Sequence, residues 1–435
     1  MVLVFPKISL KPEVEAYLLS VFKNKEILAT LQSEQSTFKF ETLLSRLSHP
    51  PAFTCIRVNT CAASTDEVKK LLREEIQKQR KGWPMSDIPV LEHPELPDVL
   101  LIPVIGPRIN LQRHSIEVVV GAQCGNAVLR GAHVFIPGIL SAPKLMKAGG
   151  AVSVYSDISG KCKRGAVEFV GSKIFVGNGI AEISRNEIFC SNCTLRGVGI
   201  RMTEPVYISP SFDNILSSFV FLQGEVIAMD KIANKVKKIK QNAENLQLKC
   251  IKVFCYDGTK ALAKEGIWDG QAGPPFPPES FDRILLDAPC SGLGQRPNMA
   301  CDWSLKEITS YPPLQRKLFR VAVNLLKPGG ILVYSTCTIT LAENEEQVAW
   351  ALDSFPCLSL QPQEPHLGEE GMMGAGLSYD QRKLLQRFDP ASVTEECTSV
   401  SCSDLDSSQI AHTIKSANKD TIGFFIAKFM KMQAS

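Results

Sequence analysis

Alternating strand and helix patterns in the second half of the chain constrain the fold more than any other feature. Apolar, strand-like runs such as GEVIAMD, FDRILLDAPC and GGILVYSTC alternate with amphipathic helical runs such as KVKKIKQNAENL. This alternation is typical of βαβ units, which build a mostly parallel sheet with helices on its faces. We therefore expect residues 204–435 to form an α/β domain with a Rossmann-like, doubly wound sheet.

Three strands of this domain end in an acidic residue, and these residues are Asp230, Asp257 and Asp287. The carboxyl ends of parallel strands meet at one edge of the sheet, where such folds bind their ligands. An acid after the second strand typically accepts hydrogen bonds from ribose hydroxyls, which is the functional interpretation of Asp230. Each acid could equally cap the helix that follows it. Three acids in register, with cysteines beside them, favour a site.

Two cysteines follow neighbouring strands of the same edge. Cys290 comes three residues after Asp287, and Cys337 ends the run GGILVYSTC. A cysteine after a strand is as often a buried core thiol as a functional one, so neither residue decides the matter alone. A cysteine hydrolase would need a histidine to activate the thiol. No histidine lies near either cysteine in the sequence, although a distant one such as His133 could approach in space.

The first 203 residues show two different patterns. Up to residue 110, helical runs such as PEVEAYLLSVF and strand-like runs such as DVLLIPVIG predict a small α+β unit. From 111 to 203, short β-type runs are separated by glycine, as in IEVVVGAQCGNAVLRGAHVFIPGI and GAVEFVGSKIFVGNGIAE. These runs predict a compact β-barrel.

Basic residues of this predicted barrel are candidates for contacts with RNA. The turn GKCKRGA presents Lys161, Lys163 and Arg164 between two predicted strands, as a phosphate-contacting loop would. Solvated surface charge is the simpler interpretation of three such residues. Arg130, in the run GNAVLRGA, is the fourth candidate.

Composition limits the partners of the chain. Of the 435 residues, 44% are hydrophobic and 21% charged, and no apolar run reaches the roughly 18 residues that span a bilayer. We expect a cytoplasmic monomer without a membrane partner. The net charge of +3 permits an RNA partner without demanding one. The 14 scattered cysteines favour reduced thiols. Cys190 and Cys193 have the spacing of half a zinc site, but no second pair follows, so we predict no metal.

The sequence around the two cysteines resembles the Sun family of RNA (cytosine-5) methyltransferases, which use S-adenosylmethionine. The shared motifs are LLDAPCSGLG, the KPGG turn, STC and ENE, in this order between Leu285 and Glu345. RVNT at Arg57–Thr60 is similar to the N-terminal unit of the family, and GAQCGNAVLRGAHVFIPGI is similar to a PUA domain. The resemblance covers nearly the whole chain. It implies the PUA-bearing type of enzyme, which methylates tRNA near its 3′ acceptor end and grips that end with the PUA domain.

The resemblance also implies a role for each residue at the strand ends. Cys337 would attack C6 of an unpaired or flipped cytosine, because the enamine so formed makes C5 able to accept a methyl group. Asp287, protonated or sharing a proton with cytosine N3, would neutralise charge on the ring. Cys290 would assist the later release of the product. DNA cytosine methyltransferases place their nucleophile at the Pro-Cys position, so exchanged roles of Cys290 and Cys337 are the alternative.

Cofactor binding is where the sequence departs from the family pattern. The resemblance implies that S-adenosylmethionine is held by three acids, Asp230, Asp257 and Asp287. A first strand and a glycine-rich loop normally precede the ribose-binding acid by about 20 residues. Here no glycine lies between Gly199 and Gly224, and only the apolar run Ser218–Gln223 could replace the strand. We expect poor cofactor binding, and an RNA-binding but catalytically impaired form is the alternative to an active enzyme.

Overall fold

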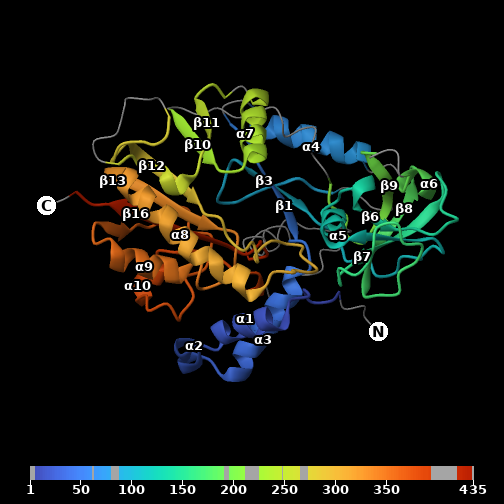
Figure 1. The fold of residues 1–435 in the computed structure, drawn as a ribbon, viewed down its shortest axis with the longest axis horizontal. Coiled ribbons are helices and arrows are strands. Elements are labelled where there is room, and N and C mark those ends of the chain that lie inside the picture. The colour runs from blue at the N-terminus through green and yellow to red at the C-terminus, as the bar shows by residue number, and fades with distance from the viewer. Residues whose placement is uncertain are drawn as a thin grey trace.

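The computed structural model describes residues 5–60, 63–79, 88–190, 195–210, 225–246, 248–264, 273–392 and 419–433. Figure 1 shows the strands of the C-terminal half at one end of the molecule and a β-rich unit at the other, with the N-terminal helices α1 to α3 along one side. Among the described residues, no helix combines the length and apolar character of a membrane-spanning segment.

The N-terminal residues form helices around a small antiparallel sheet. The helices are α1 (Pro12–Phe22), α2 (Lys25–Thr30), α3 (Ser33–Leu47) and α4 (Thr65–Gln79), and the strands are β1 (Phe53–Arg57), β2 (Leu91–Glu92) and β3 (Val99–Pro103) in the order β1-β3-β2. Helix α3 buries Phe40, Leu43, Leu44 and Leu47, which share one face at helical spacing. This face packs on Leu293 and Ile339 of the C-terminal half. The N-terminal unit is thus part of the same core as the strand ends.

The second group of strands forms one six-stranded sheet. Its members are β4 (Glu117–Gly121), β5 (Val134–Phe135), β6 (Ile139–Ser141), β7 (Ala151–Asp157), β8 (Lys173–Ala181) and β9 (Val198–Pro205), in the order β5-β9-β8-β7-β4-β6. The two end strands, β5 and β6, are joined by a single turn of 3-10 helix at Ile136–Gly138. Because so short a link cannot cross a flat sheet of six strands, the sheet must curl back on itself as a barrel. A short helix, α6 (Arg185–Ile188), connects β8 to β9.

One interpretation of this region is wrong. The pattern of the run AQCGNAVL and its neighbours predicts β-type structure, whereas residues Ala122–Leu129 form helix α5. Strand β4 ends at Gly121, and the helix then buries Val128 and Leu129 in the barrel core. Gly125 permits this close packing, because a Cβ there would lie 2.2 Å from Ser156 Oγ.

The C-terminal half contains the expected strands and helices. The strands are β10 (Val226–Asp230), β11 (Ile251–Cys255), β12 (Phe281–Asp287), β13 (Leu326–Thr336), β14 (Leu358–Leu360), β15 (Gln386–Phe388) and β16 (Phe424–Lys431). The helices are α7 (Ala233–Asn245), α8 (Leu305–Leu325), α9 (Glu345–Ser354) and α10 (Tyr379–Lys383). Parallel pairing joins β12 to β13, and antiparallel β16 extends the sheet towards β14 and β15. This is the mixed sheet of a Rossmann-like α/β domain with an antiparallel strand near its edge.

The sheet of this domain is divided into two parts. Strands β10 and β11 pair in parallel with each other, and among the described residues no strand joins them to β12. In a doubly wound sheet the first strand lies at this position, between its neighbours. The side chain of Leu285 on β12 is correspondingly 72% exposed. The run Ser218–Gln223, the candidate replacement strand, lies outside the described residues.

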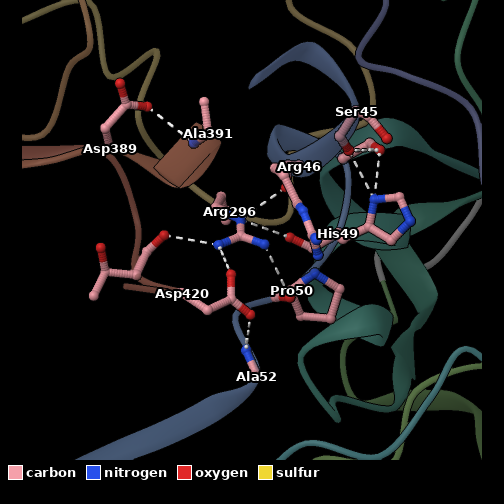
Figure 2. A network of polar contacts seen from close by, with 11 residues as sticks. Ser45, Arg46, His49, Pro50, Ala52, Arg296, Asp389, Ala391 and Asp420 are labelled. Carbon is pink, nitrogen blue, oxygen red and sulfur yellow. Dashed lines mark hydrogen bonds and ion pairs between the residues drawn. The ribbon is translucent and has the colours of Figure 1, made fainter. Parts of the chain in front are cut away.

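A buried arginine joins the N-terminal unit to the C-terminal half (Figure 2). Arg296 is 3% exposed, and its Nη1 donates to Asp420 Oδ1 at 2.6 Å and to the carbonyl of Thr421 at 2.7 Å. Its Nε donates to the carbonyls of Arg46 (2.7 Å) and His49 (3.1 Å) at the end of α3. Asp420 in turn accepts from the backbone N–H of Ala52. One guanidinium therefore fixes the loop after β12 to both the chain before β1 and the chain before β16.

Loss of this ion pair should destabilise the whole fold. Replacing Asp420 by Ala leaves the Arg296 charge buried without its partner, which typically costs about 3–5 kcal/mol of unfolding free energy. Urea denaturation followed by tryptophan fluorescence measures this loss. The matched control is Asp282→Ala, which breaks the exposed pair of Asp282 with Lys327 and should change the midpoint little. Equal midpoints for the two variants would contradict the structural role of Arg296.

Candidate active site

Adjacent parallel strands place the two cysteines side by side. In the β12–β13 pair, Asp287 lies opposite Ser335, and the backbone N–H of Ala288 donates to the carbonyl of Ser335 at 3.1 Å. Cys290 follows Asp287 by three residues and Cys337 follows Ser335 by two. The pairing of the strands therefore brings both thiols to one edge of the sheet, beside the Asp287 carboxylate.

The two thiols form a coupled pair. The Sγ atoms of Cys290 and Cys337 are 3.4 Å apart, and both residues are partly buried. A hydrogen bond from the Cys290 thiol lowers the pKa of Cys337 from 9.0 to about 6, and the Gln295 side chain also lowers it. The same hydrogen bond raises the pKa of Cys290, and burial adds to this effect. These shifts make Cys337 the more acidic thiol of the pair and Cys290 the less acidic one, which favours Cys337 as the nucleophile.

Backbone contacts hold the Cys290 loop against the Cys337 loop. The N–H of Gly294 donates to the carbonyl of Cys337 at 3.0 Å, and the N–H of Gly423 donates to the carbonyl of Gly294 at 2.8 Å. A Cβ at Gly294 would lie 2.1 Å from the carbonyl oxygen of Gly423, so only glycine allows the two backbones to approach this closely. Substitution of Gly294 would push the two loops apart.

Asp287 contacts the hydroxyl of Ser335. Its Oδ1 accepts from Ser335 Oγ at 3.2 Å, and the residue is exposed at the strand end. The carboxylate therefore keeps its second oxygen free of any contact found among the described residues. A carboxyl group in this position can exchange a proton with a ligand that lies above the two cysteines.

Asp230 and Asp257 lie at the ends of the other pair of strands. Asp230 Oδ1 accepts from the N–H of Ile232 at 2.7 Å, and Asp257 Oδ1 accepts from the N–H and hydroxyl of Thr259. The hydrogen bonds from Thr259 lower the pKa of Asp257, so that it is ionised at neutral pH. Asp257 thus caps the 3-10 turn at Gly258–Lys260, in agreement with the simpler interpretation. Asp230 bonds to the residue before α7, and no side chain caps that helix among the described residues.

In both acids the hydrogen bonds above use Oδ1, and Oδ2 remains for other partners. Asp230 Oδ2 is 3.7 Å from Lys235 Nζ, and Asp257 Oδ2 is 3.8 Å from Lys231 Nζ. Outward carboxylate oxygens of this kind fit the hydroxyls of a ribose. The described residues contain no strand that joins these two acids to the sheet of Asp287. In the described part of the chain, these two acids are therefore separated from Asp287.

The candidate RNA-binding residues differ in their surroundings. Lys161 and Lys163 are exposed in the link between β7 and β8. Arg164 donates through Nη1 to the carbonyls of Pro137 and Ile139, so its guanidinium also holds this link to β6. Arg130, which directly follows α5, is exposed, and partial desolvation lowers its pKa. Lys161, Lys163 and Arg130 are therefore the exposed candidates without a described side-chain role in the fold, whereas Arg164 also has a structural one.

The hydrolase and zinc interpretations gain no support from the geometry. His133 lies in the β-rich unit, where its Nδ1 accepts from the N–H of Met202. The groups that act on the pKa of Cys337 are Cys290, Gln295 and Asp287. Over the described ranges, no three His, Cys, Asp or Glu side chains are grouped as metal ligands would be. Cys193, half of the candidate zinc pair, lies outside those ranges.

Sequence reasoning missed two residues of this site. Gln295 contacts the Cys337 thiol, and Glu343 accepts hydrogen bonds from the residues that follow each cysteine. Glu343 belongs to the ENE motif, which marked the resemblance but received no role. The sequence does contain one indication of Glu343, which is its position six residues after Cys337 and just before the next helix. An acid at the start of a helix after a strand commonly lies near the strand ends.

Comparisons with known proteins find RNA methyltransferases that are similar to this chain. A family model described as 16S rRNA methyltransferase RsmB/F matches residues 214–430. The tRNA (cytosine(72)-C(5))-methyltransferase NSUN6 of Homo sapiens is 58% identical over 475 residues, with 99% of this chain and 100% of the relative covered. The tRNA (cytosine(72)-C(5))-methyltransferase of Pyrococcus horikoshii is 26% identical over 393 residues, with 80% of this chain and 90% of the relative covered.

A solved structure, NSun6 from Pyrococcus horikoshii with SFG, matches the fold. Its TM-score is 0.69 at 24% identity, with 98% of this chain and 99% of that chain covered. This match confirms the fold class expected from the sequence. The alignment with the human relative is 475 residues long, whereas this chain has 435 residues. The relative therefore contains a substantial stretch for which this chain has no counterpart.

The coupled thiols predict a specific pH dependence of alkylation. Because the pKa of Cys337 is lowered to about 6, its reaction with iodoacetamide should rise through pH 6 and reach its plateau below pH 8. In Cys290→Ala the hydrogen bond is lost, so the midpoint should move up towards the ordinary value of 9.0. Mass spectrometry of the peptide that contains Cys337 measures the rate at each pH. An unchanged midpoint in the variant would show that the Cys290 thiol does not act on Cys337.

Proposed function

This chain belongs to the Sun family of RNA (cytosine-5) methyltransferases, and from that premise we propose that it methylates C5 of a cytosine near the 3′ acceptor end of tRNA. The observation that carries the proposal is the pair of thiols, 3.4 Å apart at the ends of two parallel strands and next to Asp287. One thiol is ionised at neutral pH and the other is protonated, which matches the two roles that covalent methylation of cytosine needs.

Each residue of the site has one task in this reaction. The Cys337 thiolate adds to C6 of the cytosine and forms a carbon–sulfur bond, which turns C5 into a nucleophile. Asp287 shares a proton with N3 and so balances the negative charge that develops on the ring. S-adenosylmethionine, when bound, supplies an electrophilic methyl group. Once the Cys337 sulfur is bonded to C6, Cys290 no longer shares its proton with a thiolate and can release it to solvent. After methylation, the Cys290 thiolate takes the C5 proton, the electrons of the C5–H bond form the C5–C6 double bond, and Cys337 leaves as a thiolate.

An active enzyme is favoured over the catalytically impaired form. The chain is 58% identical to the human tRNA methyltransferase over nearly all of its length, and the nucleophile is geometrically complete. A chain kept only for RNA binding would have no use for a thiolate held at neutral pH. The function proposed is therefore methyl transfer, with cofactor binding as its weakest step.

For the cofactor we propose S-adenosylmethionine bound with low affinity. Asp230 and Asp257 would hold the ribose through their outer oxygens, and Asp287 would line the side that faces the cytosine. The described residues provide no glycine loop, so the backbone N–H groups that usually approach the ligand are missing. Two or three such hydrogen bonds are worth about 1 kcal/mol each, so a loss of roughly 100-fold in affinity is expected.

For the RNA we propose that the β-rich unit acts as a PUA-like domain and holds the acceptor end. In this division, residues 1–110 and 204–435 form the catalytic part and residues 111–203 the RNA-binding part. The exposed Lys161 and Lys163 are placed to contact phosphates. We propose the cytoplasm as the compartment, because the cysteines of the described residues are free thiols, which a reducing environment preserves.

The roles of the two cysteines can be separated by substitution. With labelled S-adenosylmethionine at millimolar concentration and total tRNA, Cys337→Ala should lose both methylation and the covalent RNA adduct. Cys290→Ala should form the adduct but release it slowly, so that a protein–RNA band accumulates on denaturing gels. The opposite pattern, an adduct in Cys337→Ala alone, would assign the nucleophile to Cys290.

Cofactor affinity and RNA affinity should differ in this chain. Titration calorimetry with S-adenosylmethionine should give a dissociation constant roughly 100-fold higher than that of the human relative in the same buffer. Gel shift with tRNA should give similar constants for the two proteins, because the β-rich unit is built from a separate stretch of chain. Equal cofactor affinity in the two proteins would overturn the proposal of weak binding and leave the proposed reaction intact.

A further inference from the structure

Glu343 is a fully buried carboxylate close to both cysteines. It is 0% exposed, and it accepts five hydrogen bonds, all from neutral groups. A buried carboxylate without a cationic partner is costly, and a well-packed apolar side chain often stabilises such a position as well or better. Fold stability therefore does not explain why an acid occupies this position. The positions of the groups that donate to Glu343 suggest a different explanation.

Two of the donors are the residues next to the cysteines. Ser291, directly after Cys290, donates to Glu343 through its N–H (2.9 Å) and its hydroxyl (2.6 Å). Thr338, directly after Cys337, donates through its hydroxyl at 3.3 Å. The hydroxyls of Ser291 and Thr338 are also 2.8 Å apart. One carboxylate thus connects the two loops at the residues that determine where the sulfurs lie.

Further hydrogen bonds from α8 and β13 fix the position of Glu343 itself. Gln315 of α8 donates to Glu343 Oε2 at 3.1 Å and to the carbonyl of Pro289 at 3.0 Å. The hydroxyl of Tyr334 donates to the carbonyl of Glu343 at 2.7 Å. Asn344, the next residue, donates to the carbonyl of Thr338 at 3.0 Å. Glu343 therefore cannot follow one loop without moving the other, and a shift of either loop is opposed by α8 and β13.

We propose that Glu343 is the positioning residue that holds the Cys290 and Cys337 loops at the separation at which the two sulfurs share a hydrogen bond. The inference rests on the proposed function, since that function gives the two thiols their roles. Glu343 does not touch the cytosine or the cofactor in this scheme. It acts through Ser291 and Thr338, and it makes Cys337 a thiolate by keeping Cys290 within reach.

The test is the substitution Glu343→Gln. The amide keeps the size of the side chain but replaces one acceptor oxygen by a donor, so at least one of the five hydrogen bonds to Glu343 is lost. We expect the alkylation midpoint of Cys337 to rise from about 6 towards the ordinary value of 9.0, and a complete shift lowers the thiolate fraction at pH 7 by roughly 90-fold. The readout is mass spectrometry of the Cys337 peptide, which needs neither cofactor nor RNA.

Two milder variants protect the test against misfolding. Ser291→Ala and Thr338→Val each remove one hydroxyl bond to Glu343 and should move the midpoint in the same direction by a smaller amount. Thr340→Val is the matched control, because Thr340 also donates to Glu343 Oε1 (2.8 Å) but adjoins neither cysteine. Its midpoint should stay near that of the unmodified chain.

The outcomes separate the inference from its alternatives. A midpoint near 6 in folded Glu343→Gln overturns the inference, and if that variant does not fold, unchanged midpoints in both Ser291→Ala and Thr338→Val overturn it. A shift in Thr340→Val as large as that in Ser291→Ala overturns it too, since general loosening would then explain both. If the midpoints move as expected while the unmodified chain transfers no methyl group, the proposed function fails and the positioning role of Glu343 stands.

Discussion

The buried guanidinium of Arg296 is the interaction on which the arrangement of the active site depends. It lies six residues after Cys290, and it ties the loop after β12 to the end of α3 and to Asp420 before β16 (Figure 2). Because this charge is buried away from water, its stabilisation depends on the hydrogen bonds to these partners. The apolar face of α3 then covers Leu293 and Ile339, which follow the two cysteines. Helix α3 of the N-terminal unit therefore packs directly against the loops that carry the two cysteines.

The sequence predicted the site as far as strand order determines it. Parallel strands bring their carboxyl ends to one edge, so Asp287, Cys290 and Cys337 could be placed together from local patterns alone. Local sequence does not predict helix α5, because Gly121 and Gly125 suggest turns between strands. The helix forms because Val128 and Leu129 pack into the barrel core. Gln295 has no local sequence signal, because its contact with Cys337 depends on a distance between loops that no local pattern encodes. The position of Glu343 before α9 marks it as a candidate, but its bonds to both loops follow only from the tertiary structure.

The division of the domain into two sheets separates the two halves of the reaction. All of the contacts that define the cysteine pair come from β12, β13, their loops and the chain before β16. None of these contacts involves β10 or β11, which carry Asp230 and Asp257. The lack of a joining strand among the described residues therefore affects the surroundings of Asp230 and Asp257 before those of the cysteine pair. It also leaves part of β12 uncovered, as the exposure of Leu285 shows.

The contacts of the nucleophile explain why the cysteine pair does not depend on β10 and β11. A lowered thiol pKa requires a hydrogen bond that outweighs burial, because burial raises the pKa of Cys337. That hydrogen bond comes from the Cys290 loop. Glu343 and Arg296 both hold this loop, the first through Ser291 and the second through the backbone at the end of α3. Neither set of contacts involves β10 or β11. The low pKa of Cys337 therefore depends on contacts within the folded protein that are separate from the strands that carry Asp230 and Asp257.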